Sequence, residues 1–260
     1  MNNKVLFFRK NKKKPVFSII TVVKNSENLI LNTIRSVEKQ TFKNFEFIII
    51  DGKSNDNTIA QILTKKKILN YLISHKDKGI YDAMNTGLKI SNGEIIVFLN
   101  SGDILLKNAL KIIDKFFSKK NIDFVFGTVR RHYTKKTILK YGYNPKRLRY
   151  NFDFATTHSA GFFMKKTSIN KVGFYDLKYK CSADYDYYYR TIFKNNMIGD
   201  STKKSQLIGI VSSGGYSSKI SFMNHLLEEC KIRYNNGQNI FLIIVIFFNA
   251  IIKDFIKKFY

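Results

Sequence analysis

The sequence has few of the residues on which several protein classes depend. Its 260 residues include no tryptophan, two prolines and two cysteines, Cys181 and Cys230. Two cysteines are too few for the disulfide scaffold of a small secreted domain and are typical of a reducing compartment. The four histidines and two cysteines also lack the spacing of a zinc site. The N-terminus has a basic cluster but no long apolar stretch and no small-residue cleavage site, so we expect no signal peptide.

Several motifs of nucleotide-dependent and hydrolytic enzymes are missing as well. No glycine-rich loop precedes a lysine, and no GxGxxG follows a strand-like run, which argues against P-loop enzymes and dinucleotide-dependent dehydrogenases. The lack of GxSxG argues against the hydrolases that use it. A nucleotidyltransferase needs a glycine-rich basic loop after its first strand, where this chain has TVVKNSEN instead.

Acidic residues are scarce: 19 Asp and Glu stand against 45 Lys and Arg, which gives a net charge of +26. A basic surface favours nucleic acid, anionic lipid or phosphorylated substrates. The basic residues are dispersed and mostly lysine, whereas nucleic-acid-binding proteins cluster arginine with aromatic residues. We therefore expect no nucleic-acid partner and keep a basic nucleic-acid-binding protein only as an alternative.

Apolar runs of strand length alternate with segments whose apolar residues have helical spacing. The strand-like runs are 16–23, 45–50, 71–74, 95–99 and 124–129, and the helix-like segments are 28–40, a segment from about 54–56 toward 66, 80–90 and 109–117. This alternation predicts an α/β fold with a mostly parallel central sheet and helices on both faces.

The pattern loosens after residue 129. We expect one or two strands in 130–143, a turn at Asn144-Pro145, an apolar run at 160–164 and a tyrosine-rich helix over 184–195. The chain divides into a basic N-terminal arm (1–14), an α/β domain (15–220) and a C-terminal helical segment (221–260).

Polar residues follow three of the predicted strands: Asn25, Asp51 and the segment 100–103. Ligands of parallel sheets bind outside the carboxyl ends of the strands, so we expect these residues to converge on one crevice. Asp103 ends the sequence FLNSGD. Mg²⁺ or Mn²⁺ is commonly held by one or two carboxylates together with substrate phosphates, so Asp103 is a candidate ligand. A turn or helix-capping role suits the spacing of Asp103 equally well.

Six segments occur in an order that resembles bacterial family 2 glycosyltransferases, especially the branch that builds surface polysaccharides such as colanic acid or O-antigen. They are SIITVVKN, IIIDGKSNDNT, KDKGIYDAMNTG, NGEIIVFLNSGD, HSAGFFMKK and SADYDYYYR, within residues 15 to 220. The resemblance implies a GT-A fold with a smaller acceptor-side region. It also implies a nucleotide-diphosphosugar donor, in particular a UDP-sugar, a glycan or lipid-linked acceptor, and a divalent cation, Mn²⁺ or Mg²⁺.

The resemblance also assigns donor-site roles by position. Thr21 and the backbone near Val23 would border the nucleotide base, and Asp51 would bind the base or its ribose. Asp82 and Asn85 would line the donor pocket, where Gly79 permits a close backbone approach. Asp82 and Asp51 could instead be helix caps.

Metal and acceptor roles follow in the same way. Asp103 would be the metal ligand, and Asn100 stands where relatives often have a first carboxylate. His158 and the Gly214-Gly215 loop match positions near the acceptor and diphosphate, although His158 could equally be a structural histidine beside a strand.

Asp184 matches the aspartate of the family motif that supplies the catalytic base. Ala183 replaces the usual glutamate, so Asp186 remains an alternative base, with an ion pair to a nearby basic residue as its other reading. We expect the neighbouring tyrosines, 185 and 187–189, to be core or rim residues. One base without an enzyme nucleophile predicts inversion at the anomeric carbon. The departures at Asn100 and Ala183 leave a weakly active or inactive nucleotide-sugar-binding scaffold as an alternative.

The segment 240–252, IFLIIVIFFNAII, is nearly all apolar and is followed by Lys253, Lys257 and Lys258. It is shorter than the roughly 20 residues of a spanning helix. It could lie in the interface of an anionic membrane, or pack on the domain or a second copy. We expect a cytoplasmic protein, with peripheral membrane contact as one of these alternatives.

Overall fold

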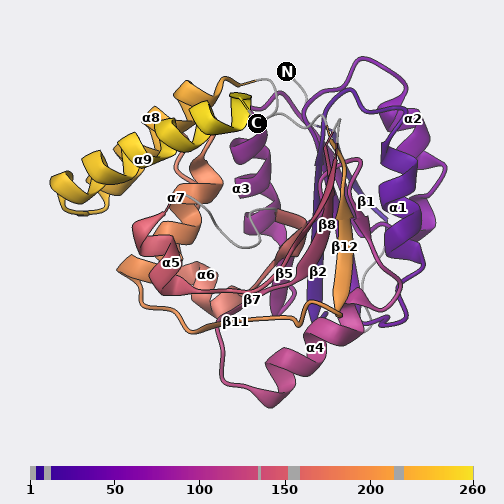
Figure 1. Ribbon diagram of the computed structural model, residues 1–260. Helices are drawn as coiled ribbons and strands as arrows, with labels where there is room; N and C mark the ends of the chain where they lie inside the picture. The colour runs from indigo at the N-terminus through magenta and orange to yellow at the C-terminus, as the bar shows by residue number, and fades with distance from the viewer. Residues whose placement is uncertain (1–3, 9–12, 134–135, 152–158, 214–219, 260) are drawn as a thin grey trace.

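The computed structural model describes residues 4–8, 13–133, 136–151, 159–213 and 220–259 (Figure 1). Its centre is an eight-stranded sheet in the order β1-β4-β3-β2-β5-β10-β7-β11. Four neighbouring strands of this sheet are parallel: β4 (Tyr71–Ser74), β3 (Phe45–Asp51), β2 (Phe17–Val23) and β5 (Ile95–Phe98). The predicted mostly parallel α/β sheet is confirmed.

Short strands extend the parallel unit on both sides. β1 (Lys4–Phe7) pairs antiparallel with β4, so part of the basic N-terminal segment joins the sheet. At the other side β10 (Phe162–Lys165) runs antiparallel between β5 and β7 (Phe124–Phe126), and β11 (Gly199–Ser201) completes the edge.

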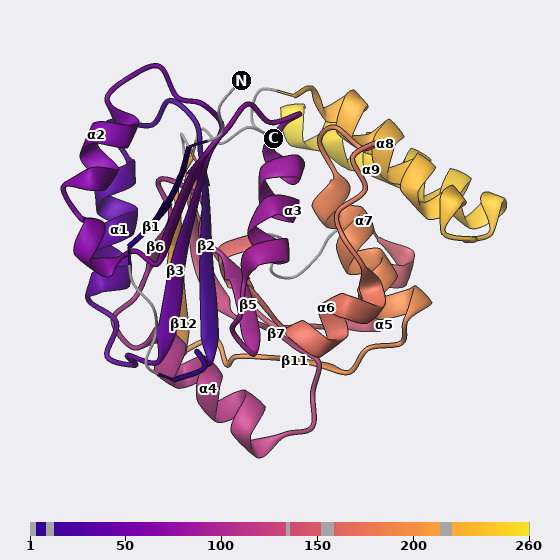
Figure 2. The same ribbon diagram turned by 180° about the vertical axis from the view of Figure 1, so that it is seen from behind.

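Helices cover both faces of the sheet, as Figures 1 and 2 show from opposite sides. One face packs on α1 (Ile30–Glu38), α2 (Thr58–Leu63) and α4 (Ala109–Lys119), with a 3₁₀ turn at Lys66–Ile68. The other packs on α3 (Ile80–Ile90), α6 (Lys166–Val172) and α7 (Ala183–Tyr189), which continues as a π-helix over Arg190–Lys194.

The continuous apolar runs arise because each central strand is buried on both faces. In β2, Ile19 belongs to the core on the α1 face and Ile20 to the core on the α3 face. In β3, Ile49 belongs to the core on the α1 face and Ile48 to the core on the α3 face. Every residue of β2 and β3 is buried.

The predicted strand over 124–129 is wrong as a single element. The chain leaves the large sheet after β7 and enters a second, four-stranded sheet at β8 (Thr128–His132). Gly127 lies between the two strands, and a Cβ there would lie 2.5 Å from the Ile208 side chain. The second sheet has the order β6-β12-β8-β9, with β6 (Ile104–Leu105), β12 (Leu207–Val211) and β9 (Thr137–Lys140). Both halves of the run are apolar, so the pattern did not mark the change of sheet.

The turn expected at Asn144-Pro145 is instead the start of α5 (Pro145–Tyr150). Proline is well suited to the first turn of a helix because no intrahelical partner is lost there. A 3₁₀ turn at Ser159–Gly161 precedes β10. The chain ends in a hairpin of two helices, α8 (Phe222–Asn235) and α9 (Ile240–Phe259), beside α7 (Figure 1).

The close approach of α3 to β2 gives a test of the fold. A Cβ added at Gly87 would lie 2.4 Å from Cγ2 of Ile20, which is fully buried in β2. We expect Gly87→Ala to lower the free energy of unfolding by about 1–3 kcal/mol, because overpacking outweighs the better helix propensity of alanine. Urea denaturation measures the change, with Lys89→Ala on the exposed side of the same helix as control. Equal midpoints for the two variants would contradict this packing.

Candidate active site

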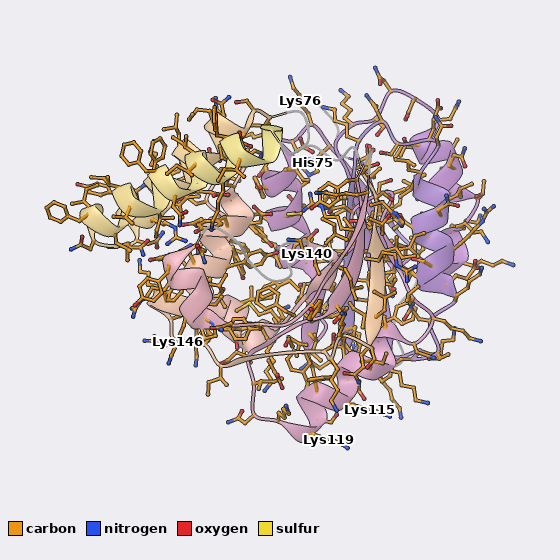
Figure 3. All side chains as sticks on the ribbon, in the orientation of Figure 1. His75, Lys76, Lys115, Lys119, Lys140 and Lys146 are labelled. Carbon is orange, nitrogen blue, oxygen red and sulfur yellow. The ribbon has the colours of Figure 1, made fainter. Side chains whose placement is uncertain are left out.

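The carboxyl ends of the parallel strands meet at one end of the molecule. In Figure 3, His75 and Lys76, which follow β4, mark this end, and Lys115 and Lys119 of α4 mark the opposite one. Ser54 joins the first two predicted polar positions, because its Oγ donates to Asp51 Oδ1 at 2.5 Å and accepts from the Asn25 amide at 2.8 Å. Of the three positions expected to converge, Asn25 and Asp51 are thus joined at this end, and one crevice lined by all three stays a prediction.

Asp51, the last residue of β3, is fully buried and held in a fixed orientation. The Ser54 amide donates to Asp51 Oδ2 at 3.1 Å, and Ser74 Oγ donates to the same oxygen at 2.6 Å. The carboxylate therefore joins the loop that follows β3 to the last residue of β4. It caps neither neighbouring helix in this arrangement, and its role toward a base or ribose stays a prediction.

Thr21 and Val23 lie at the carboxyl end of β2, next to the loop that follows β3. Thr21 is fully buried, and its Oγ1 donates to the Leu99 carbonyl at 2.6 Å. Val23 ends β2, and its carbonyl accepts from the Gly52 amide at 2.9 Å. Both residues hold neighbouring strand ends together at the place where the resemblance predicts the nucleotide base.

The turn at 100–103 is fixed from two sides. Gly102 has a φ of +95°, a conformation that favours glycine, and its amide donates to Thr33 Oγ1 of α1 at 2.9 Å. Thr33 Oγ1 in turn donates to the Asp103 carbonyl at 2.9 Å. From the other side, the Ser212 amide donates to Asp103 Oδ1 at 3.1 Å. Asp103 thus belongs to a turn, as the alternative interpretation expected. Its carboxylate lies in the turn that follows β5.

Several polar groups of this turn are buried. Burial raises the pKa of Asp103 to about 7, against the opposing effects of the Ser212 amide and Arg131. Asn100 Nδ2 donates to Ser159 Oγ at 3.1 Å. Its Oδ1 and the hydroxyl of Ser101 are buried without a hydrogen-bond partner in the described part of the chain. Unpaired buried polar atoms are costly, so these two atoms are candidates for contact with a ligand. Ser101 belongs to the polar segment 100–103 predicted from the sequence, but the sequence assigned no individual role to it.

A divalent cation suits these residues only as part of a complex with the donor. Within the described ranges, no three His, Cys, Asp or Glu side chains gather in a way that could hold a metal ion. Asp103 and Asn100 Oδ1 offer two oxygen groups, which do not make an all-protein cage. Mg²⁺ and similar ions are commonly bound by one or two carboxylates and completed by substrate phosphates and water. The oxygen groups of Asp103 and Asn100 fit a site of this latter kind, which substrate phosphates and water complete.

The residues of α3 have mainly structural contacts. Asp82, in the first turn of α3, accepts through Oδ2 at 3.0 Å from the amide of Lys78, which lies before the N-cap Gly79. Gly79 has a φ of +123° at the start of the helix. Asn85 exchanges two hydrogen bonds with the backbone of Tyr175, each of 2.9 Å. Asn85 therefore fixes the loop before α7, and a direct role of Asp82 or Asn85 in the donor pocket stays a prediction.

The structure separates the two candidate bases. Asp186 is 2% exposed and is engaged at both oxygens, by Arg190 Nε at 2.7 Å and Asn236 Nδ2 at 3.0 Å. The predicted ion pair of Asp186 with a nearby basic residue is confirmed, and Arg190 is that residue. Asp184 is half-buried, and its Oδ1 lies 3.2 Å from the Tyr81 hydroxyl and 2.9 Å from the Tyr185 amide. Its Oδ2 has no hydrogen bond from any residue that the structure describes. Asp184 is therefore the carboxylate with an oxygen available to a substrate.

Burial raises the pKa of Asp184, although the Tyr185 amide, the Tyr81 hydroxyl and His225 oppose the shift. The adjacent tyrosines are core residues, as expected. Tyr187 stacks on Tyr175 with ring centroids 4.5 Å apart, and Tyr188 packs against Phe162 at 4.7 Å. His158 and Gly214-Gly215 lie outside the described residues.

Solved structures of other proteins share this fold. S. aureus TarS in complex with UDP-GlcNAc aligns with a TM-score of 0.69 at 18% identity, over 90% of this chain and 72% of that one. A mannosyltransferase of Pyrobaculum calidifontis, solved with GDP-Man and Mn²⁺, aligns with a TM-score of 0.66 at 13% identity, over 92% and 69%. At these identities the likeness supports the GT-A fold alone.

Curated relatives are similar in sequence. UDP-Glc:alpha-D-GlcNAc-diphosphoundecaprenol beta-1,3-glucosyltransferase WfgD of Escherichia coli is 34% identical over 135 residues, which cover 52% of this chain and 53% of that protein. The match thus spans about half the length of that relative. A PGL/p-HBAD biosynthesis glycosyltransferase of Mycobacterium tuberculosis is 31% identical over 66% of this chain and 68% of that protein.

A model of the family described as "Glycosyl transferase family 2" matches residues 18–176, which contain the parallel strands, α3 and the 100–103 turn. The match covers more than half of the chain and agrees with the relatives and with the fold. This chain belongs to glycosyl transferase family 2.

Proposed function

We propose that this chain is an inverting glycosyltransferase that moves a sugar from a nucleotide-diphosphosugar, in particular a UDP-sugar, to a hydroxyl of a glycan or lipid-linked acceptor in bacterial surface polysaccharide synthesis. The observation that carries the proposal is Asp184, a half-buried carboxylate with a raised pKa and one oxygen free of protein hydrogen bonds. The E. coli relative, whose printed name includes UDP-Glc and a diphosphoundecaprenol acceptor, supports this substrate class.

Asp184 answers the main chemical difficulty of the transfer, the weak nucleophilicity of an acceptor hydroxyl. As general base it removes the proton while the hydroxyl oxygen attacks the anomeric carbon and the nucleoside diphosphate leaves. A raised pKa suits this role because a general base works best when its pKa is near the operating pH. The Tyr81 hydroxyl and the Tyr185 amide bind Oδ1 and leave Oδ2 for the acceptor. A single displacement of this kind inverts the anomeric carbon.

The donor lies, in this proposal, along the strand ends. The base and ribose contact the segment around Asp51, Thr21 and Val23, and the diphosphate lies toward Asn100 and Asp103. Asp103 and Asn100 Oδ1 are the groups that would hold Mn²⁺ or Mg²⁺. When bound there, the cation would offset the negative charge that grows on the leaving diphosphate.

Asp184→Asn tests the base. The amide keeps the shape of the side chain but cannot accept a proton, so we expect kcat to fall by about 10²–10⁴-fold. Turnover of a panel of UDP-sugars measures the loss, and calorimetry with UDP should show donor-site binding within twofold of the unmodified protein. Asp176→Asn, which removes a carboxylate paired with Lys178 near the surface, is the matched control and should keep full turnover. Full activity in Asp184→Asn would remove this residue as the base.

The pH dependence of turnover follows from the same carboxyl. Because the base must be deprotonated and its pKa is raised, kcat should fall as the pH decreases, with a midpoint above the ordinary range of an aspartate. A profile between pH 4 and 9 measures this acid limb. If the midpoint of this decrease in kcat lies near pH 4 in the unmodified protein, a base whose pKa is raised by burial is contradicted.

The cation site has a test in both directions. Asp103→Asn should weaken Mn²⁺-dependent UDP binding at least tenfold, because the only carboxylate proposed as ligand is lost. Asn100→Asp should strengthen it, because Oδ1 would then carry charge at the same place. Calorimetry with UDP in Mn²⁺ or EDTA measures both, and Asp114→Asn on α4 is the control. UDP binding that is equal in Mn²⁺ and EDTA for all variants would exclude the cation site.

We further propose that the protein acts at the cytoplasmic face of the membrane, held peripherally through α9. Among the described residues no helix is long and apolar enough to cross a membrane. One side of α9 is nevertheless exposed and apolar at helical spacing, with Phe241, Val245, Phe248, Ile252 and Phe255 between 56% and 75% exposed. A cleft of about 630 Å³ under the α8–α9 turn is lined by Arg149, Lys194 and Leu242. Basic groups beside an exposed apolar helix face favour an interface rich in anionic lipid.

Replacement of the exposed side chains tests this contact without disturbing the packed side of α9, where Ile243 and Ile246 are buried. The triple variant Phe241→Ser, Val245→Ser, Phe248→Ser should lose most co-sedimentation with vesicles that contain phosphatidylglycerol. The control replaces Phe174, Leu177 and Ile198, which are 44–58% exposed elsewhere, with serine and should sediment like the unmodified protein. Unchanged sedimentation of the α9 variant would exclude this helix as the membrane contact.

A further inference from the structure

Glu228, in α8, is bonded to the segment that leads into α7. Its Oε1 accepts from the Lys180 amide at 2.7 Å, and its Oε2 accepts from the amides of Cys181 at 2.8 Å and Ser182 at 2.7 Å. Cys181 Sγ also lies 2.9 Å from Oε2. One carboxylate thus binds three consecutive residues, and Asp184 follows two residues later.

The hydrogen bonds of Glu228 act on the amides of residues 180–182, which lie before the helical residues of α7 and end at its N-cap. The first N–H groups of a helix have no intrahelical partner, and a side-chain acceptor usually satisfies some of them. Ser182, at the N-cap position of α7, makes no side-chain capping bond. Glu228 supplies acceptors to the segment from another helix.

The hydrogen bonds from residues 180–182 also favour the charged form of Glu228. Burial alone would raise its pKa, but the hydrogen bonds from Cys181 and from the amides of Lys180, Cys181 and Ser182 together lower the pKa below its ordinary value. A charged acceptor makes stronger hydrogen bonds than a neutral one. The segment 180–182 is therefore held firmly.

α3 binds the same segment from the opposite side. The Tyr81 hydroxyl lies 3.1 Å from the Cys181 carbonyl and 3.2 Å from Asp184 Oδ1. Cys181 is thus bound through its amide by α8 and through its carbonyl by α3. The entry to α7, and with it the direction of the Asp184 side chain, is set between these two contacts.

α8 itself is well anchored, so that Glu228 has a fixed position. Arg233 is fully buried and donates to the carbonyls of Leu148, Arg149 and Asn151 at the end of α5. Asn236 donates to Asp186 in α7. The helix is therefore tied to α5 on one side and to α7 on the other.

We propose that Glu228 is a positioning residue for Asp184, a role that rests on the proposed function of Asp184 as base. Glu228 touches neither donor nor acceptor in this account. It fixes residues 180–182 so that the Asp184 carboxyl keeps its half-buried place against Tyr81. Further titratable groups that act on this carboxyl are His225 and Glu229 of α8, Tyr188 of α7 and Tyr175.

Two measurements that need no substrate test the position. In Glu228→Ala, we expect hydrogen exchange at the amides of Lys180, Cys181 and Ser182 to rise at least tenfold. We also expect the pKa of Asp184, followed by carboxyl ¹³C NMR and assigned with Asp184→Asn, to move down toward its ordinary value, because a loosened segment exposes the carboxyl to water. Glu228→Gln, which keeps one acceptor oxygen, should show smaller changes of the same sign and covers the case in which the alanine variant does not fold.

Turnover gives the functional readout. With the best UDP-sugar of the panel, kcat of Glu228→Gln should fall at least fivefold, the donor KM should stay within twofold, and Glu228→Asp should recover part of the loss. Asp123→Asn is the matched control, because that carboxylate also holds a backbone amide, that of Ile198, and the Ser168 hydroxyl near the opposite ends of the strands. It should leave the titration of Asp184 and kcat unchanged.

The outcomes separate the two proposals. Faster exchange with an unchanged Asp184 pKa and unchanged kcat would make Glu228 a stability residue only and would overturn the positioning role. If Asp184→Asn is fully active, the proposed base fails on its own, whereas the titration of Asp184 in the Glu228 variants still decides whether Glu228 positions that carboxyl.

Discussion

The parallel pairing of β4, β3, β2 and β5 is the constraint on which the rest of the site depends. Each of these strands is surrounded by apolar side chains on both faces, so polar groups gather where the strands end. All four strands end on the same side, which brings Asp51 and the 100–103 turn to one edge. Serine and threonine hydroxyls then join the loops, as Ser54 joins Asn25 to Asp51 and Thr33 fixes the turn before β6.

Asp184 reaches this region by a different route. It belongs to α7, which lies past the residues matched by the family model, and it is placed by contacts from α3 and α8. The hairpin α8–α9 therefore connects two parts of the proposed function. α8 holds the segment that leads to Asp184. α9 lies at the edge of the molecule (Figures 1 and 2), and one side of it is apolar and exposed.

The sequence predicted those features that depend on local periodicity, and missed those that depend on contacts between distant residues. The runs around Ile19 and Ile49 identified the buried strands, and with them the convergence of Asn25 and Asp51. Nothing local distinguishes the two halves of 124–129, and the contact of Gly127 with Ile208, at the change of sheet, joins residues far apart in the sequence. The bonds of Glu228 with residues 180–182 and of Asn85 with Tyr175 join segments about 50 to 90 residues apart, which periodicity does not reveal. The resemblance identified Asp184, but the separation from Asp186 required the partners Arg190 and Asn236.

The most direct test of the account is an experimental structure of the protein with Mn²⁺ and an unreactive UDP-sugar analogue. We expect the diphosphate and the cation at Asp103 and Asn100, and the nucleoside over the ends of β2 and β3 near Asp51. The Asp184 carboxyl should lie on the side of the anomeric carbon opposite the leaving group. A nucleotide bound elsewhere, such as the cleft under the α8–α9 turn, or an Asp184 remote from the anomeric carbon, would contradict it.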